Sequence, residues 1–340
     1  MFDFATTHPA VSTTLAWLAT YLLHSTLLLA LAMLASRAWR SRHLLAEEAV
    51  WRIALFGPIA TATLQIAAGY RPVFGALKLA VAPAIGAASF GPVAAMPPSN
   101  FGPIAHEPLQ LAKNATFVSL SPAAWWVAAW ALVAAALLLR LAFAYRSLSR
   151  RLDPRLEVVG GTPHRTLARL VAEAEVKRPV HLTCAHRLPV PVALGVLRGE
   201  IAVPPRALSH LDAAEQESLL AHELAHLARR DPLSLALTHA MAAIFFFQPL
   251  NWVARKRLRA ISELLCDQWA VDRTGRPVTL ARCLATVADW SLGTRLPAPG
   301  MADPGTPLAQ RIRRLLDRGA APVRALPRGA DAGEEPADKA

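Results

Sequence analysis

The sequence is poor in charged residues and in cysteine. Only 18% of its 340 residues are charged, against about a quarter in soluble globular proteins, and 54% are hydrophobic. This composition argues against an ordinary soluble domain and favours a membrane protein. The three cysteines, Cys184, Cys266 and Cys283, fit no disulfide framework. Their number and spacing argue against a disulfide-stapled secreted domain and favour reduced thiols in a cytosolic region.

Acidic residues are too few to balance the basic ones, and the formal net charge is +12. A charge of this size is compatible with nucleic acid or with an anionic membrane surface. The arginines gather beside the apolar stretches described next, and no DNA-binding motif accompanies them. We therefore expect a lipid bilayer as a partner and no direct contact with nucleic acid.

Three apolar stretches occupy the N-terminal part, at about residues 11–35, 53–70 and 120–140; the first two carry no formal charge, and the third has none before Arg140. Each approaches or exceeds the roughly 20 residues that a helix needs to cross a bilayer. The segment between the second and third stretches, 71–119, is rich in proline, glycine and alanine. The sequence therefore predicts a transmembrane domain over 1–145 with three spans and one long loop of little regular structure.

The basic residues predict the orientation of these spans. They crowd the short loop after the first span and the segment after the third: Arg37, Arg40, Arg42, Arg140, Arg146, Arg150, Arg151 and Arg155. By the positive-inside bias, the N-terminus and the loop 71–119 lie outside and residues from 146 onward lie in the cytosol.

Residues 146–320 have a mixed, charged, globular pattern. "RLEVV", "RPVHLTC" and "VPVALGVLRGEIAVP" are typical of strands, and amphipathic helices are predicted at about 162–177, 212–230, 233–247, 252–274, 278–290 and 308–318. The expected fold is therefore an α-helical membrane protein fused to a cytosolic α+β domain, with 321–340 as a disordered tail.

The helix at 212–230 contains "LLAHELAHLARRDP". Asp212 and Glu215 are spaced for a capping box at its start. Pro232 disfavours helical geometry at Asp231, so we expect the helix to end there and Asp231 to cap the next one.

His222 and His226 lie four residues apart, so both imidazoles project from one helix face and can bind one metal ion. Glu223 lies about 100° around the helix, near enough to act as general base on a water molecule. The alternative is a solvated helix with incidental histidines. A chance His-Glu-x-x-His match occurs on the order of once in a hundred such chains.

A third ligand is expected in "LRAISELLCDQWAVDRTG", residues 258–275. Glu263 and Asp267 share a helix face, so Glu263 could ligate the metal while Asp267 accepts the N–H of a ligating imidazole. Alternatively, Glu263 only pairs with Arg259. Cys266 is a further candidate ligand, but it lies about 60° off the Glu263 face, which favours structural burial.

The apolar segment 233–253 resembles a fourth span, yet a single crossing would separate Glu263 from the two histidines. Arginines flank both of its ends, and Gln248-Pro249 interrupts it. We therefore predict that it does not cross the membrane once. It is either a core helix or a segment that enters the inner leaflet and returns.

These residues resemble a known family. The three spans, "LLAHELAHLARRD", "FFFQPLNWVARKRLRAISELLCDQWAV" and "LAQRIRRLL" are similar to the sensor-transducer metallopeptidases of penicillinase and methicillin-resistance regulation, the antirepressor zinc proteases of bacterial membranes. The resemblance covers most of residues 10–318. It implies a gluzincin-type site in a protein of the bacterial inner membrane, with one Zn²⁺ held by His222, His226 and Glu263, Glu223 as base and Asp267 behind.

The resemblance also implies cleavage of a cytosolic protein, either a winged-helix repressor or the protease itself. The stretch "ALGVLRGEIAVP" resembles the edge strand on which such proteases align an extended substrate. The candidate substrate-strand residues are Ala193, Leu194, Gly195, Val196 and Leu197. Whether the protein forms a homo-oligomer is left open.

The sequence also departs from the antibiotic-sensing members, which carry a further span and an outer penicillin-binding domain. The chain ends shortly after "RIRRLL", contains no Ser-x-x-Lys, and has Gln248 where asparagine is usual. We therefore expect no β-lactam sensing by this chain. Two rival functions are a membrane quality-control zinc protease of the heat-shock or prenyl-peptidase type, and a non-catalytic membrane receptor or scaffold.

Overall fold

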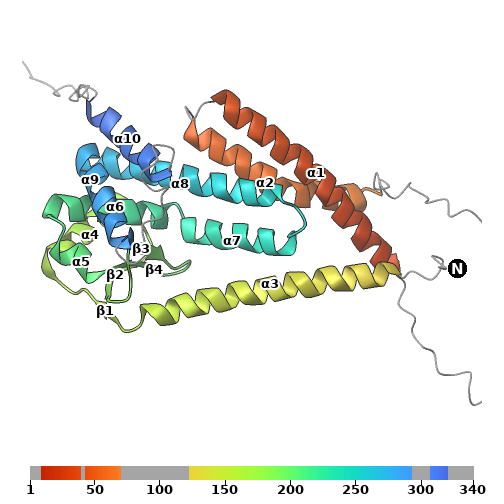
Figure 1. Ribbon diagram of the computed structural model, residues 1–340, viewed down its shortest axis with the longest axis horizontal. Coiled ribbons are helices and arrows are strands. Elements are labelled where there is room, and N and C mark those ends of the chain that lie inside the picture. Colours follow the sequence, from red (N-terminus) through yellow and green to blue (C-terminus); the bar gives the residue numbers. More distant parts are fainter. Residues whose placement is uncertain (1–8, 40–42, 70–121, 293–306, 321–340) are drawn as a thin grey trace, which may run out of the picture. The chain divides into compact units, whose positions relative to one another are not determined.

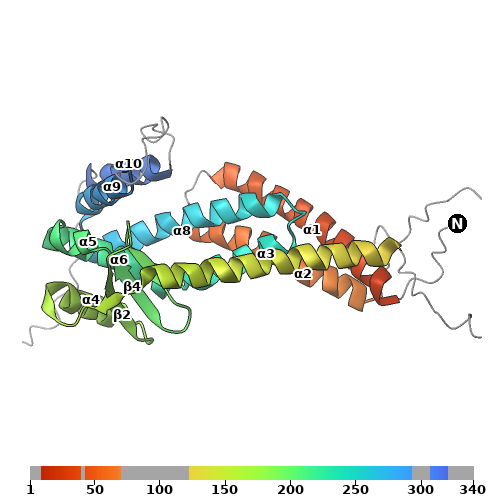
Figure 2. The same cartoon turned by 60° about the horizontal axis from the view of Figure 1, so that its bottom comes forward.

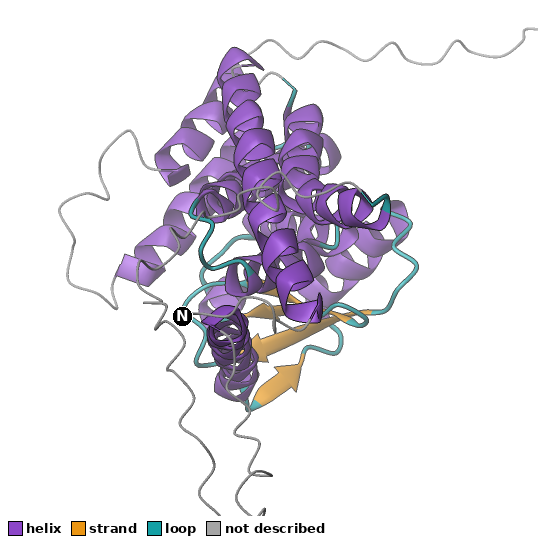
Figure 3. Ribbon diagram, turned by 90° about the vertical axis from the view of Figure 1, so that its right-hand side faces the viewer, coloured by secondary structure: helices purple, strands orange, loops and turns teal. Residues whose placement is uncertain are grey.

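The computed structural model describes residues 9–39, 43–69, 122–292 and 307–320. Helices predominate, and the strands gather in one small sheet (Figure 3). The predicted loop 71–119 and the predicted tail 321–340 lie outside the described residues. The chain divides into two compact units, 1–27 with 56–133 and 28–55 with 134–340.

Three N-terminal helices are long and apolar enough to cross a membrane: α1 (Pro9–Trp39), α2 (Leu44–Ala67) and α3 (Pro122–Leu152) (Figure 1). α2 starts well before the predicted span at 53, and α3 continues past the predicted end at 140. The differences arise because charged residues near a span end do not stop a helix. Glu47 and Glu48 consequently belong to the first turns of α2.

In the first unit, side-chain hydrogen bonds join α1 to α2. Trp17 Nε1 donates to Thr63 Oγ1 at 3.1 Å, and His24 Nδ1 lies 2.9 Å from Thr61 Oγ1. Large apolar side chains of all three helices are exposed here: Leu27, Leu64, Trp126 and Leu132. Such a surface is suited to lipid rather than water.

The second unit contains the sheet, with strands β1 (Arg155–Glu157), β2 (Val180–Ala185), β3 (Val192–Leu194) and β4 (Gly199–Val203). Their order is β1-β2-β4-β3. The central pair β2–β4 is parallel, and the two outer pairs are antiparallel. Helix α4 (Gly161–Glu173) connects β1 to β2. Strand β3 is therefore an edge strand with one side unpaired within the described sheet.

The stretch "VPVALGVLRGEIAVP" forms a hairpin rather than one strand. β3 ends at Leu194, and Gly195 has a φ of 89°. A Cβ at residue 195 would lie 1.8 Å from the carbonyl oxygen of Arg198, so only glycine fits this turn. The prediction that all five substrate-strand candidates share a strand is wrong, because three of them follow β3 in the turn: Gly195, Val196 and Leu197.

Among the described residues, six helices follow the sheet: α5 (Pro205–Ser209), α6 (Ala213–Ala228), α7 (Asp231–Ile244), α8 (Leu250–Thr274), α9 (Pro277–Leu292) and α10 (Pro307–Ala320). The predicted helices are thus present, with ends shifted by a few residues. α6 is central, since it packs against α4, α8 and α9 and against β3 and β4. The core around it includes Leu170, Leu182, Ile201, Leu224, Leu227 and Leu280.

The apolar segment 233–253 is divided between two helices, close to the predicted ends at 247 and 252. α7 ends at Ile244, residues 245–249 form a turn, and α8 returns alongside α7 (Figures 1 and 2). At 14 residues α7 is about 21 Å long, shorter than the roughly 30 Å core of a bilayer. Gln248 is buried in the turn, and its side-chain oxygen accepts the N–H of Leu250 at 3.3 Å, which supports the start of α8.

Candidate metal centre

Helix α6 is held at both ends. Asp212 Oδ1 accepts the Glu215 N–H at 2.8 Å and Glu215 Oε2 accepts the Asp212 N–H at 3.2 Å, which is the predicted capping box. At the other end the guanidinium of Arg178 donates to the carbonyl of Leu227, one of the last carbonyls of the helix. The face between them therefore presents its side chains from a fixed backbone.

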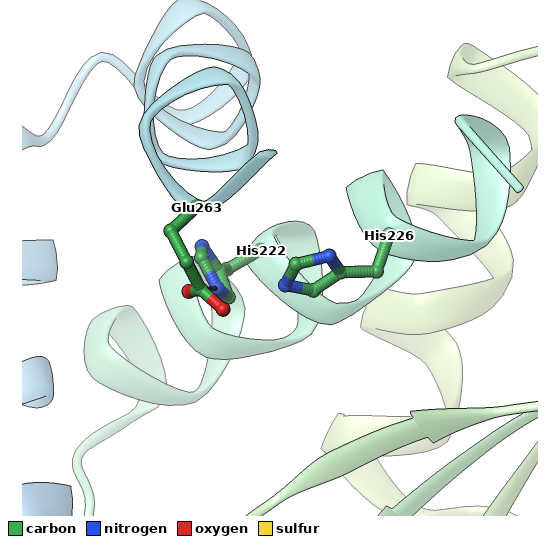
Figure 4. Close-up of side chains that lie close together, drawn as sticks. All are labelled: His222, His226 and Glu263. Carbon is green, nitrogen blue, oxygen red and sulfur yellow. Dashed lines mark ion pairs between the residues drawn. The ribbon is translucent and has the colours of Figure 1, made fainter. Parts of the chain in front are cut away.

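His222 and His226 on α6 point towards Glu263 on α8 (Figure 4). One ligand atom from each of the three residues lies within 4.8 Å of the others. His222 Nε2 is 3.6 Å from Glu263 Oε2. The packing of α6 against α8 thus brings together residues that the chain separates by the whole of α7.

Asp267 lies behind His222, on the side away from Glu263. Its Oδ1 is 3.1 Å from His222 Nδ1, and Arg311 donates to both of its oxygens at 2.7 Å. Arg311 comes from α10 and also pairs with Glu263 at 2.8 Å. Glu263 forms no ion pair with Arg259 in the described part of the chain. The alternative that Glu263 serves only an Arg259 pair therefore does not match the structure.

Asp231 lies behind His226. Its Oδ2 is 2.9 Å from His226 Nδ1 and accepts the hydroxyl of Ser262 at 2.6 Å. The prediction that Asp231 caps α7 is wrong. Arg230 occupies the N-cap position with a left-handed backbone (φ 59°, ψ 35°), and Asp231 is the first helical residue. Its carboxylate is not available to the α7 backbone because it bonds to the histidine and the serine.

The two carboxylates engage the Nδ1 atoms, which leaves both Nε2 atoms for a metal. Sequence analysis identified Asp267 but missed Asp231 and Arg311. Asp231 is next to the arginines that follow the motif, and its position alone suggested only a cap. Arg311 is one of several arginines on α10, and nothing local distinguishes it.

Cys266 is fully buried, as expected, beside the same group. Its Sγ lies 3.3 Å from His226 Nδ1 and 3.4 Å from Asp231 Oδ2, so these three residues form a second close set of donor atoms. Burial, together with the nearby charge of Asp231, raises the pKa of the Cys266 thiol far above its usual range. Because metal ligation needs a thiolate, this environment disfavours Cys266 as a ligand.

The electrostatics favour a cation between the ligands. Burial alone would lower the pKa of His222, but the carboxylates of Asp267 and Glu263 outweigh it and raise that pKa to about 9. Burial would raise the pKa of Glu263, yet His222 and Arg311 hold it well below its usual range. Glu263 is therefore an ionised carboxylate next to His222, at a position where the surrounding carboxylates favour a positive charge.

Glu223 and the three clustered residues line a cavity of about 410 Å³. Val192 and Ala193 of the edge strand β3 form part of its wall. The edge strand β3, the candidate base Glu223 and the three candidate metal ligands therefore line the same cavity.

Comparison with known proteins places the chain in a peptidase family. The family model described as BlaR1 peptidase M56 matches residues 77–279, more than half of the chain. Over 84 residues, the chain is 33% identical to the "Regulatory protein BlaR1" of Bacillus licheniformis, an alignment that covers 25% of this chain and 14% of that protein. The chain thus spans about a seventh of that relative's length. The matched family region contains both the α6 motif and Glu263, and the chain belongs to the BlaR1-type membrane metallopeptidase family described as BlaR1 peptidase M56.

Proposed function

We propose that the protein is a membrane-embedded zinc metalloendopeptidase of signal transduction, with a gluzincin-type site. His222, His226 and Glu263 hold one Zn²⁺, and Glu223 is the catalytic base. The observation that carries the proposal is the convergence of the three ligand types within 4.8 Å, beside Glu223 in one cavity. Membership of a peptidase family supports hydrolysis of a peptide bond.

The donor set fits zinc. Two imidazole nitrogens and one carboxylate are the ligands of many catalytic zinc sites, which keep one further position open. A Cys-rich structural site would have no such position. When bound, zinc lowers the pKa of a water molecule towards 7 and polarises the scissile carbonyl.

Glu223 provides proton transfer. It is buried, follows His222 on α6 and lines the cavity, which supports this role. It takes a proton from the attacking water and gives it to the leaving amine. Asp267 fixes the orientation of His222 while the reaction proceeds.

The substrate is proposed to bind as an added strand along β3. Ala193 and Leu194 are in this strand and pair with Ile201 and Glu200 of β4 on one side only. The other edge offers backbone donors and acceptors to an extended peptide, which is the usual basis of strand addition. The neighbouring cavity would then hold the scissile bond.

The basic residues in and just after the C-terminal parts of α1 and α3 support a cytosolic position for the peptidase domain and an outer N-terminus, in a bacterial inner membrane. A cytosolic protein is therefore the proposed substrate. The relative is called a regulatory protein, which supports a transcriptional repressor or the protease itself as the target. The quality-control alternative usually has two spans between its motifs. Residues 227–262 are all described, and none of the three helices that are both long and apolar enough to cross a membrane lies among them.

The test uses the full chain purified in detergent and the same variants expressed in bacterial cells. Wild type is expected to bind about one Zn²⁺, and Glu223→Gln should keep the metal but lose the cleavage products seen with wild type. Glu217→Gln is the matched control, since Glu217 lies on the same helix but pairs with Arg169 and Arg276 outside the cavity. The proposal fails if wild type holds no zinc or if Glu223→Gln cleaves the same proteins.

A further inference from the structure

The support behind His226 continues beyond Asp231 into helix α2. Arg229 Nε lies 3.4 Å from Asp231 Oδ2, and Arg229 Nη2 donates to Glu48 Oε1 at 2.6 Å. Glu48 is in the early turns of α2 and is 181 residues from Arg229 in the sequence. A continuous series of charged side chains therefore joins the membrane helix to a proposed metal ligand.

Each member of this series is shielded from water. The side chains of Glu48, Arg229, Asp231 and His226 are 9%, 16%, 12% and 17% exposed. At such burial, an ion pair is weakly screened, and the loss of one partner weakens the charge compensation of the other. Glu48 also lines the catalytic cavity, so its carboxylate is close to the site itself.

The two ligating histidines are supported differently. The His222 series ends on Arg311 of α10, which bonds Asp267 with two hydrogen bonds. The His226 series reaches Glu48, where Arg52 also donates to the same oxygen at 2.7 Å. The geometry at His226 thus depends on where the first turns of α2 lie.

We propose that Glu48 is a positioning residue of the metal site: through Arg229 and Asp231 it holds His226 in its metal-binding orientation, so that movement of α2 changes zinc affinity. This inference rests on the proposed zinc peptidase function. It gives the membrane segment a physical means to regulate the protease, because a displacement of α2 separates Glu48 from Arg229 and releases the Asp231 carboxylate that orients the imidazole.

The preceding residue supplies a matched control. Glu47 is fully buried, and its Oε1 pairs with Arg257 Nη2 at 2.6 Å. This ion pair also joins α2 to the peptidase domain, but Glu47 contacts neither a proposed ligand nor the carboxylates behind one in the described residues. Glu47→Gln and Glu48→Gln therefore remove equivalent charges from the same turn of the same helix, and only the second acts on His226.

The experiment measures the Zn²⁺ dissociation constant of the full-length protein in detergent by competition with a chromophoric chelator. A residue bonded directly to a ligating histidine typically changes metal affinity 10- to 100-fold. We expect a loss in this range for Asp231→Asn, about fivefold for Glu48→Gln, and none beyond error for Glu47→Gln. The visible spectrum of the Co²⁺-substituted protein should shift for Asp231→Asn and Glu48→Gln only.

A double-mutant cycle separates positioning from general damage. In an Arg229→Gln background, Glu48→Gln should have no further effect on zinc affinity, because the series is already interrupted. Thermal denaturation of each variant checks that the two glutamate substitutions destabilise the protein to a similar extent. If Glu47→Gln and Glu48→Gln change zinc affinity equally, or if neither does, the positioning role is wrong. If wild type binds no zinc, the proposed function fails and the positioning role with it.

Discussion

Arg311→Met tests whether Arg311 on α10 and the metal ion both neutralise the carboxylates of the site. Arg311 contacts two carboxylates at 2.7–2.8 Å, and its side chain is 13% exposed. Its removal leaves Asp267 and Glu263 close together without their guanidinium. The loss of one partner from a buried ion pair costs about 3–5 kcal/mol. Methionine fills a similar volume, so the cost is electrostatic rather than a packing defect.

The expected loss depends on zinc. In the metal-free protein the single charge of the His222 imidazolium then faces two carboxylates, and we expect a loss towards about 3–5 kcal/mol. For a domain of this size that corresponds to a fall in Tm of about 6–20 °C. With zinc bound, Glu263 is neutralised by the ion, and we expect the fall in Tm to be clearly smaller. Arg311→Lys should be intermediate, since lysine restores the charge but not the two parallel hydrogen bonds.

The assay is thermal denaturation of the detergent-purified chain, followed by circular dichroism with saturating Zn²⁺ or with a chelator. Arg276→Met is the control, because Arg276 pairs with Glu217 while about half exposed and such pairs contribute only about 0–1 kcal/mol. An equal fall in Tm for Arg311→Met with and without zinc would refute the shared-charge reasoning. If Arg311→Met lowers Tm no more than Arg276→Met does, the expected cost of about 3–5 kcal/mol for losing the buried ion pair is wrong.

Two further predictions concern pH and substrate binding. Because the pKa of His222 is raised to about 9, its imidazole carries a proton at pH 7 in the metal-free site, and zinc must displace that proton. Zinc affinity should therefore weaken by about tenfold for each pH unit below about 9. Calorimetry at pH 7 should show about one proton released for each zinc ion bound. A zinc affinity that stays constant from pH 6 to 8 would contradict this prediction. Neighbouring residues of β3 direct their backbone N–H groups to opposite edges, so one of Val192 and Ala193 donates towards the open edge. Of the two variants Val192→Pro and Ala193→Pro, the one that removes this N–H should raise KM for the cleaved protein, while the zinc content stays constant. An unchanged KM for both variants would exclude β3 as the substrate strand.

The local parts of the site were predictable from sequence because they rest on helix periodicity. The spacing of His222 and His226 and the capping residues Asp212 and Glu215 are properties of one helix. The interruption of 233–253 was predictable from Gln248-Pro249, and the structure has a turn there between α7 and α8. That the segment does not cross the membrane once stays a prediction.

The errors arose where tertiary contacts override local preference. Asp231 is a good capping residue next to Pro232, but His226 and Ser262 use its carboxylate instead. The run from Ala193 to Leu197 has the apolar content of a strand, yet the positive φ of Gly195 reverses the chain. In both cases the sequence is compatible with two local structures. Partners distant in sequence decide between them for Asp231, and the backbone geometry of Gly195 decides for the stretch from Ala193 to Leu197.

Glu47 and Glu48 show which signal was overlooked. They precede an apolar stretch at the end where the positive-inside bias expects lysine and arginine, so two adjacent carboxylates there have no membrane explanation. Their burial is unfavourable unless each has a cationic partner. The chain provides Arg257 and Arg229, both of which follow apolar segments of the peptidase domain. Acidic residues at the predicted cytosolic end of a span are therefore informative in themselves, because they indicate that the span packs against a basic surface of its own chain. Here that surface includes the support of a proposed zinc ligand.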